Sequence, residues 1–336
     1  MNAKTRWIIG IVMIVFALLL VGFYAIKGKV EQWMLFPAGT LPFGLFPNHV
    51  LRMHPLEHWD RVVKPEPREI AYQTREDGIQ NIRYWYIPSP PPNAASESEA
   101  SGEEASEEEA KAQSTNEDKN ITNPKPLHPV VLYFHGNSGT AADRLPIISE
   151  IRRSGPRLRD ASIVIAEYPG YAGDPLPPSE SVFLPNAKAI VSHVFEEFCK
   201  DKQGGGEREL LVIGRSLGSC IATYVASLPN SPVRSLVLIS PFPSIPLVAK
   251  KFGKFVPFDL LVRSPFRAEN WAPSVKCPVT VIHGTADTLV PVRLGRKQAG
   301  NFPGVPQFHE IAGGHNTVDS NPEFWPSVYG GLTMSL

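Results

Sequence analysis

The sequence has few cysteines and no excess charge of either sign. Its 336 residues include three cysteines, and 33 basic residues balance 33 acidic ones. Cys199, Cys220 and Cys277 are far apart, without the Cys/His spacing of a metal site or the density of a disulfide framework. A chain with neither net charge nor a basic cluster offers nucleic acid no electrostatic attraction. We therefore expect no metal site, no disulfide framework and no nucleic-acid partner.

One long uncharged segment lies near the start of the chain. The twenty residues 7–26 carry no charge, and at about 1.5 Å per residue a helix of this length crosses a hydrocarbon core of about 30 Å. A cleaved signal peptide is the competing interpretation, but the run is longer than a usual h-region and no A-x-A site follows it. We expect residues 1–30 to be a membrane anchor, in a single-pass protein of the endoplasmic reticulum or another endomembrane. Its orientation stays open, because basic residues flank both ends.

Composition divides the chain after the anchor into a juxtamembrane segment, residues 31–68, and a globular domain, residues 69–336. The domain contains an insert, residues 89–128, which is rich in Pro, Ser, Ala and Glu and has nine acidic and three basic residues. Such a composition predicts disorder and a solvated tether, with regulation or partner binding as the alternative. Asn120 begins a glycosylation sequon there, which can report on topology.

Short apolar runs alternate with longer amphipathic stretches through the domain. This alternation predicts βαβ units and a mostly parallel sheet with helices on both faces. An amino-terminal hairpin is expected around Glu76-Asp77-Gly78. The expected strands are 69–74, 81–88, 130–134, 162–167, 210–214, 235–240, 279–283 and 307–311; the expected helices are 141–153, 179–202, 217–228, 292–301 and 322–329.

Ser216 lies in the sequence Gly214-Arg215-Ser216-Leu217-Gly218. A G-x-S-x-G pattern alone is weak evidence, but here it follows an apolar strand and opens a small-residue helix. That context is typical of a nucleophile elbow, in which a strained turn lifts the serine hydroxyl above the sheet. We predict Ser216 as the nucleophile, and we expect the side chains of Arg215 and Leu217 to serve only in packing or at the rim of the site.

A serine nucleophile needs a base and an orienting acid, which should follow it in the order acid, then histidine. Asp287 follows the strand expected at 279–283, with Asp259 as its competitor. His315 lies in a glycine-containing loop after the last strand, the position of a general base. A loop histidine without function is the alternative, and His309 is expected to be structural.

The oxyanion of the reaction requires hydrogen-bond donors beside Ser216. The amide of Leu217 opens the helix after the nucleophile and can stabilise a developing negative charge. His135-Gly136-Asn137-Ser138-Gly139 interrupts the fold after an earlier strand. We choose Asn137 as the second donor, although a turn needed only to enter the next helix would also explain the glycines.

Six sequence blocks resemble the α/β-hydrolase superfamily, and more closely its single-pass membrane members, which include lysophospholipid lipases and protein depalmitoylases. The resemblance implies the α/β-hydrolase fold, a triad of Ser216, Asp287 and His315, and an oxyanion hole of the Asn137 and Leu217 amides. Two departures are Asp174-Pro175-Leu176-Pro177-Pro178, where a glycine-containing stretch is expected, and the acidic insert. The blocks are 134–137, 167–171, 214–218, 240–242, 283–287 and 313–316.

Residues 242–274 form an expected short cap that mixes cations with apolar residues. These apolar residues can meet lipid or cover an acyl pocket. We therefore predict a membrane-anchored serine esterase or thioesterase of lipid-like or acylated substrates, acting through an acyl-enzyme without cofactor. The alternatives are a serine peptidase of the same fold and a non-catalytic membrane-tethered binding module.

Overall fold

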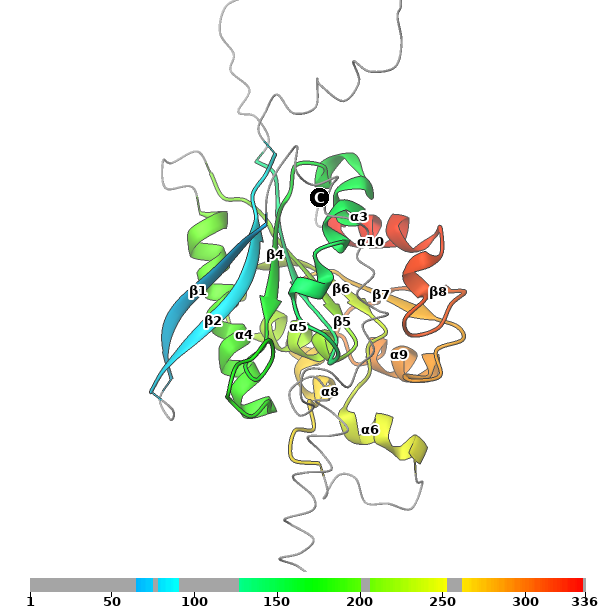
Figure 1. The fold of residues 1–336 in the computed structure, drawn as a ribbon. Coiled ribbons are helices and arrows are strands. Elements are labelled where there is room, and N and C mark those ends of the chain that lie inside the picture. Colours follow the sequence, from blue (N-terminus) through cyan, green and yellow to red (C-terminus); the bar gives the residue numbers. More distant parts are fainter. Residues whose placement is uncertain (1–64, 75–77, 91–126, 201–205, 253–261, 335–336) are drawn as a thin grey trace, which may run out of the picture.

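The computed structural model describes residues 65–74, 78–90, 127–200, 206–252 and 262–334 (Figure 1). The predicted anchor at 7–26, nearly all of the juxtamembrane segment and residues 91–126 of the insert lie outside these ranges. Among the helices that are described, none combines the length and apolar character needed to cross a bilayer.

An eight-stranded sheet forms the centre of the domain, in the order β1-β2-β4-β3-β5-β6-β7-β8. Strand β2 is antiparallel to β1 and β4, whereas the other neighbouring pairs are parallel. The predicted mostly parallel sheet is therefore confirmed. The strands are β1 Glu66–Thr74, β2 Gly78–Ile87, β3 Val130–Phe134, β4 Ser162–Glu167, β5 Leu210–Arg215, β6 Val233–Ile239, β7 Val279–Gly284 and β8 Gln307–Ile311.

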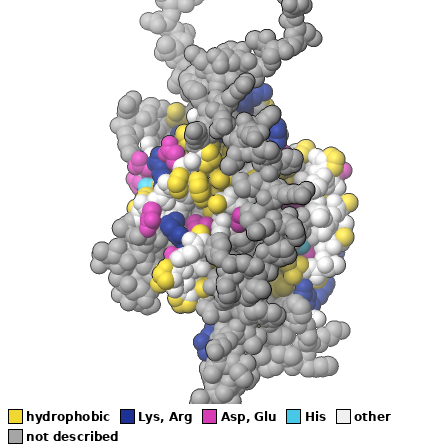
Figure 2. All heavy atoms as spheres, in the orientation of Figure 1, with side chains coloured by type: hydrophobic (Ala, Val, Ile, Leu, Met, Phe, Trp, Pro, Cys, Tyr) yellow, Lys and Arg dark blue, Asp and Glu magenta, His cyan; other side chains and the backbone are white. Residues whose placement is uncertain are grey.

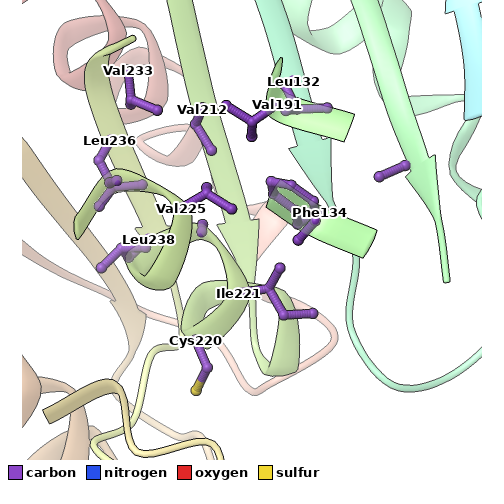
Figure 3. Close-up of a cluster of buried hydrophobic side chains, with 14 of the residues drawn as sticks. Leu132, Phe134, Val191, Val212, Cys220, Ile221, Val225, Val233, Leu236 and Leu238 are labelled. Atoms are coloured by element: carbon purple, nitrogen blue, oxygen red, sulfur yellow. The ribbon is translucent and has the colours of Figure 1, made fainter. Parts of the chain in front are cut away.

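Helices cover both faces of the sheet, so the central strands are apolar along their whole length. In β5, Leu210 and Val212 point into one core cluster while Leu211 and Ile213 point into the other. Helices α4 (Glu180–Val194), α5 (Leu217–Ser227) and α9 (Val292–Ala299) contribute to the first cluster, part of which is shown in Figure 3. Helices α3 (Ile147–Arg153) and α10 (Phe324–Thr333), which contact each other, cover the second.

Two predicted helices are interrupted within their expected ranges. The helix expected at 141–153 is split into a 3-10 turn, Ala142–Arg144, and α3, with Pro146 between them. Proline lacks the N–H that a continuous helix would need there. The helix expected at 179–202 leaves the α conformation after Val194 and continues as a π-turn, Phe195–Cys199, which stacks Phe198 on Tyr86 with 4.1 Å between ring centroids.

Helix α10 continues past the predicted end at residue 329. The prediction stopped at two glycines, but Gly331 lies inside the helix, against β7. A Cβ atom at Gly331 would come within 2.7 Å of the Thr280 Cβ atom. This glycine therefore permits close packing of the helix on the sheet, rather than ending the helix.

The described ends of the insert lie at the amino ends of the parallel strands. Ile87, the last residue of β2, pairs with Ile163 near the start of β4, while β3 begins beside Ser162. Arg208 holds both ends by donating hydrogen bonds to the His128 carbonyl at 2.5 Å and to the Ser89 hydroxyl at 3.4 Å. Strand β1 begins at Glu66, three residues before the strand start expected at residue 69.

Candidate active site

Ser216 lies in the turn between β5 and α5, at the carboxyl end of the parallel strands. Its φ of 53° and ψ of −118° are unusual for a residue with a side chain. The turn is held because the Ser216 N–H donates to the Ile239 carbonyl at 2.8 Å and the Ser216 carbonyl accepts from the Ser219 hydroxyl at 2.6 Å. The surrounding contacts therefore fix the strained turn that the sequence predicted.

The two glycines of the motif allow backbone segments to approach this turn. A Cβ atom at Gly214 would lie 2.5 Å from the Gly218 carbonyl oxygen, and one at Gly218 would lie 2.2 Å from the Phe134 carbonyl oxygen. Both obstacles are backbone atoms, which cannot rotate away. The glycines therefore let α5 begin directly against the end of β3.

The structure brings Ser216, His315 and Asp287 together from three loops. The distance from Ser216 Oγ to His315 Nε2 is 3.0 Å, and that from His315 Nδ1 to Asp287 Oδ2 is 2.7 Å. Asp287 follows β7 and His315 follows β8, so both lie at the same end of the sheet as Ser216. Ser216 is 8% exposed, and the Asp287 side chain is fully buried.

Asp287 is surrounded by hydrogen-bond donors. Its Oδ1 atom accepts from the N–H groups of Leu289 at 2.9 Å and Val290 at 2.7 Å. Burial opposes ionisation of this carboxyl, but hydrogen bonds from His283 and His315 and from the Val290 N–H hold its pKa below the usual value. An ionised Asp287 favours a proton on His315 Nδ1, which leaves Nε2 able to accept the Ser216 proton.

Arg215 does more than pack, which corrects the expectation for its side chain. Its guanidinium donates to Asp319 Oδ2 at 2.7 Å and to the His315 carbonyl at 2.9 Å. It therefore ties the elbow to the loop that carries His315. The motif gave no signal for this contact, because the partners lie about a hundred positions away. The Leu217 side chain, in contrast, is buried in the first core cluster as expected.

Both predicted oxyanion donors belong to segments that flank Ser216. Leu217 is the first residue of α5, so its amide lies at the helix N-terminus. Asn137 follows β3, and its neighbour Gly136 lies so close that a Cβ atom there would be 3.6 Å from Ser216 Cβ. The Asn137 carbonyl accepts a hydrogen bond from the Tyr171 hydroxyl at 2.9 Å.

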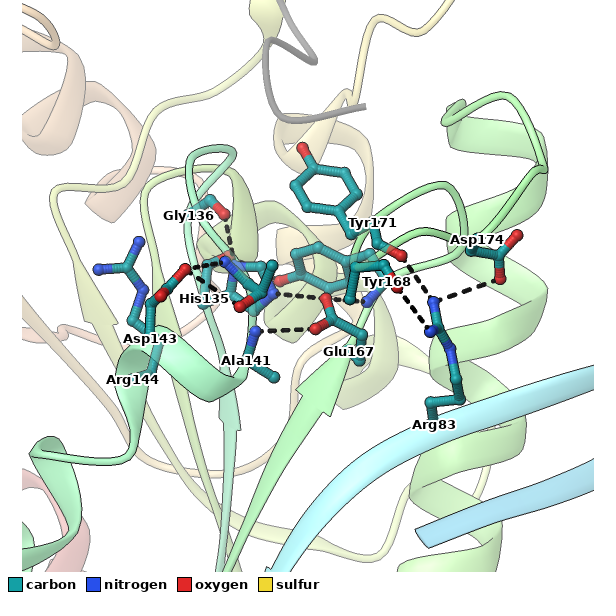
Figure 4. A network of polar contacts seen from close by, with 12 residues as sticks. Arg83, His135, Gly136, Ala141, Asp143, Arg144, Glu167, Tyr168, Tyr171 and Asp174 are labelled. Carbon is teal, nitrogen blue, oxygen red and sulfur yellow. Dashed lines mark hydrogen bonds and ion pairs between the residues drawn. The ribbon is translucent and has the colours of Figure 1, made fainter. Parts of the chain in front are cut away.

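A buried polar network joins the end of β4 to the segment that follows β3 (Figure 4). Glu167 at the end of β4 accepts from the Ala141 N–H at 2.9 Å and from the Tyr168 N–H at 3.1 Å. In the unexpected stretch that begins at Asp174, the carboxylate accepts from the Leu176 N–H at 2.8 Å and lies 3.5 Å from Arg83. The sequence block around Glu167 was recognised, but no role had been assigned to its side chains.

The remaining candidates lie elsewhere or outside the described residues. Asp259 is not described, and His309 lies on β8 in register with Ile282. Among the described residues, no cluster of His, Cys, Asp and Glu has the arrangement of a metal site. On the face shown in Figure 2, the described acidic, basic and apolar side chains are interspersed.

Two short helical segments, α6 (Ile245–Ala249) and α8 (Ala268–Trp271), occupy the expected cap region. Leu247 and Val248 are partly buried against the first core cluster. Lys251 donates to the Leu289 carbonyl at 2.8 Å, which joins the cap to the loop of Asp287.

Comparison with known proteins identifies the fold of this chain. Residues 129–262 match the family described as the alpha/beta hydrolase fold. The esterase Pf2001 of Pyrococcus furiosus superposes with a TM-score of 0.54 at 17% identity, covering 82% of this chain and 92% of the esterase. A putative hydrolase of Agrobacterium vitis S4 superposes with a TM-score of 0.50 at 15% identity, covering 80% and 99%. At such identities the likeness concerns the fold.

Two kinds of relatives are similar in sequence. The uncharacterized protein Rv2307c of Mycobacterium tuberculosis is 28% identical over 189 residues, which are 56% of this chain and 63% of that protein. Lysophosphatidylserine lipases ABHD12 of Danio rerio and Rattus norvegicus are 27% and 28% identical, over 51% of this chain and 46% and 44% of theirs. The matched region thus spans about half the length of these lipases. The sheet order, the elbow and the match of residues 129–262 are those of the alpha/beta hydrolase fold.

Proposed function

We propose that this protein is a serine hydrolase that cleaves carboxylic ester or thioester bonds through an acyl-enzyme. The observation that supports the proposal most is the unbroken chain of contacts from Ser216 Oγ through His315 to Asp287, at 3.0 and 2.7 Å. Such a chain has the geometry of a nucleophile, its general base and the acid that orients the base.

The reaction has two steps, acylation of Ser216 and hydrolysis of the acyl-enzyme. Ser216 Oγ bonds to the acyl carbon while its proton passes to His315 Nε2, and the amides of Leu217 and Asn137 stabilise the oxyanion. Collapse of this intermediate breaks the bond to the alcohol or thiol, which leaves with the proton from His315. Water then adds to the acyl-enzyme with His315 again as base, which releases the carboxylic acid and restores Ser216.

A fluorophosphonate probe and a p-nitrophenyl ester test the activity. The wild-type protein should label and turn over the ester, while Ser216→Ala should not label and should lose several orders of magnitude in kcat. Ser227→Ala is the matched control, since it removes a serine hydroxyl at the far end of the same helix, bonded to the Tyr224 carbonyl. Equal rates for Ser216→Ala and wild type would exclude the mechanism.

The substrate class that we propose is a lipid-like acyl ester at a membrane surface. The lysophosphatidylserine lipase relatives and the apolar cap residues Leu247 and Val248 support this class. A panel of lysophospholipids, monoacylglycerols, acyl-coenzyme A thioesters and acylated peptides, assayed on the full chain, distinguishes the candidates. Preference for the peptides would contradict the lipid assignment.

We also propose that residues 7–26 anchor the protein in a membrane. Their length and lack of charge support an anchor. The full chain should remain in the membrane pellet after alkaline carbonate extraction, while a chain that starts at residue 31 should be released and still label with the fluorophosphonate. Release of the full chain by carbonate would contradict the anchor.

A further inference from the structure

Three consecutive backbone carbonyls beside Ser216 accept hydrogen bonds from side chains. The His135 carbonyl accepts from the Tyr168 hydroxyl at 2.6 Å, and the Asn137 carbonyl accepts from the Tyr171 hydroxyl at 2.9 Å. Between them, the Gly136 carbonyl oxygen lies 2.7 Å from His135 Nδ1. Every carbonyl of this short stretch is therefore held from outside the backbone.

The orientation of these carbonyls determines the orientation of the amides. In a planar trans peptide the C=O and the following N–H point in opposite directions. The Asn137 N–H belongs to the peptide between Gly136 and Asn137, and the Gly136 carbonyl of that peptide is bonded to His135 Nδ1. The next peptide begins with the Asn137 carbonyl, which is bonded to the Tyr171 hydroxyl. Fixing the carbonyls therefore also fixes the N–H groups of the same peptides, which point in the opposite direction. The backbone at Gly136 lies beside Ser216.

The hydroxyls of Tyr168 and Tyr171 are suited to remain hydrogen-bond donors, because they do not lose their protons. Tyr168 and Tyr171 are 2% and 0% exposed, and burial raises the pKa of both phenols above the usual value. Their rings pack edge to face at 5.6 Å and enclose the His135 ring, whose centroid is 4.3 Å from that of Tyr168. The hydroxyls therefore stay protonated and fixed in position.

A further clamp holds the loop that carries Tyr171. Arg83 on β2 donates to the Tyr171 carbonyl at 2.6 Å and to the Ala172 carbonyl at 3.1 Å. Gly170, Ala172 and Gly173 all have positive φ. Glycine adopts such angles readily, but the φ of 48° at Ala172 is strained for a residue with a side chain and persists only where its surroundings hold it. The guanidinium supplies two of the contacts that do so (Figure 4).

We propose that Tyr171 is a positioning residue for the oxyanion hole, and that Arg83 acts through it by clamping its loop. Tyr171 touches no reacting atom; its hydroxyl fixes the peptide after Asn137, which adjoins the peptide that carries the Asn137 N–H, and so limits rotation of that N–H away from the oxyanion. This inference rests on the proposed hydrolase function and extends it to two residues to which the sequence assigned no role.

Tyr171→Phe tests the proposal, because it removes one hydroxyl and keeps the ring. A misaimed oxyanion donor should lower kcat for a p-nitrophenyl ester about 10- to 100-fold and leave KM unchanged. Affinity for a trifluoromethyl ketone, whose adduct carries an oxyanion, should fall by the same factor as kcat. A purely structural role would not link these two losses.

Tyr84→Phe is the matched control. It also removes a tyrosine hydroxyl from a buried side chain, but that hydroxyl lies 2.8 Å from His193 Nε2, in the contact between β2 and α4. Its kcat and inhibitor affinity should equal those of the wild type.

Arg83→Lys provides a second variant, which decides the matter if Tyr171→Phe does not fold. It should show the same linked losses, and the double variant should lose no more than Tyr171→Phe alone, because both act on one loop. A kcat within twofold of wild type, or a lower kcat without weaker inhibition, would overturn the inference alone. Absence of labelling and turnover in the wild type would overturn the proposed function together with it.

Discussion

The Arg215 guanidinium donates a hydrogen bond of 2.9 Å to the carbonyl of His315. The residue before the proposed nucleophile therefore holds the loop of the proposed base. Because Asp319 belongs to the same loop and also binds Arg215, one side chain fixes the loop at two points.

Arg215→Met should reduce ester turnover by misplacing His315. A displacement of about 1 Å can cost about 100-fold in rate, so we expect a loss of between about 10- and 100-fold in kcat. Steady-state kinetics measure it. Arg157→Met, which breaks a remote ion pair with Glu209, is the control and should keep the wild-type kcat. A wild-type rate for Arg215→Met would show that the loop holds without this contact.

Asp287 should make stability depend on pH in the acid range. Its pKa is lower in the folded protein than in the unfolded chain, so as pH falls below about 4 the unfolded chain binds the proton first. The stabilisation is complete above that pH and is lost as pH falls toward the folded pKa. Urea unfolding of wild type and Asp287→Asn between pH 7 and 3 should show a steeper acid loss in the wild type. Parallel curves would contradict this assignment.

Gly218→Ala should disrupt the elbow. The added Cβ would meet backbone oxygens of Phe134 and His135 at 2.2 and 2.5 Å, so the start of α5 must shift. We expect a loss of about 1–3 kcal/mol in the free energy of unfolding and a decrease of at least about 100-fold in fluorophosphonate labelling rate. Labelling kinetics and urea unfolding provide the measurements, and a wild-type labelling rate would contradict the packing argument.

Replacing each of two adjacent glycines of α10 by alanine should change the stability of the protein in opposite directions. A Cβ at Gly330 meets nothing within 4 Å, whereas one at Gly331 meets Thr280 at 2.7 Å. Gly330→Ala should therefore stabilise the protein by about 0.5–1 kcal/mol through helix propensity, while Gly331→Ala should destabilise it by about 1–3 kcal/mol. Each variant serves as the control for the other in thermal unfolding. Shifts of the same sign would refute the packing of this helix on β7.

The sequence predicted those features of the fold that are determined by residues close to one another along the chain. Three strands, 130–134, 162–167 and 307–311, have the expected bounds, because apolar runs bounded by turns identify buried strands. Ser216, Asp287 and His315 could be selected because each follows a strand, and strand ends meet at one edge of a parallel sheet.

Contacts between distant segments could not be predicted in the same way. The sequence predicted no further role for the Arg215 side chain than packing or the rim, because Asp319 is distant in the chain and becomes its neighbour only in the folded protein. Likewise, nothing near Tyr171 indicates that its hydroxyl reaches Asn137, 34 positions earlier. The continuation of α10 through Gly331 depends on the space left beside Thr280, which only packing reveals.

The position of the insert has a practical consequence for protein engineering. Its ends lie at the amino ends of β3 and β4 and are fastened by Arg208, whereas Ser216 lies at the carboxyl end of β5. Strands β2 and β3 flank β4, so their neighbouring ends are about 10 Å apart. A fluorescent reporter or an affinity handle can therefore replace residues 91–126, because the described residues on either side of this segment lie at the end of the sheet opposite Ser216.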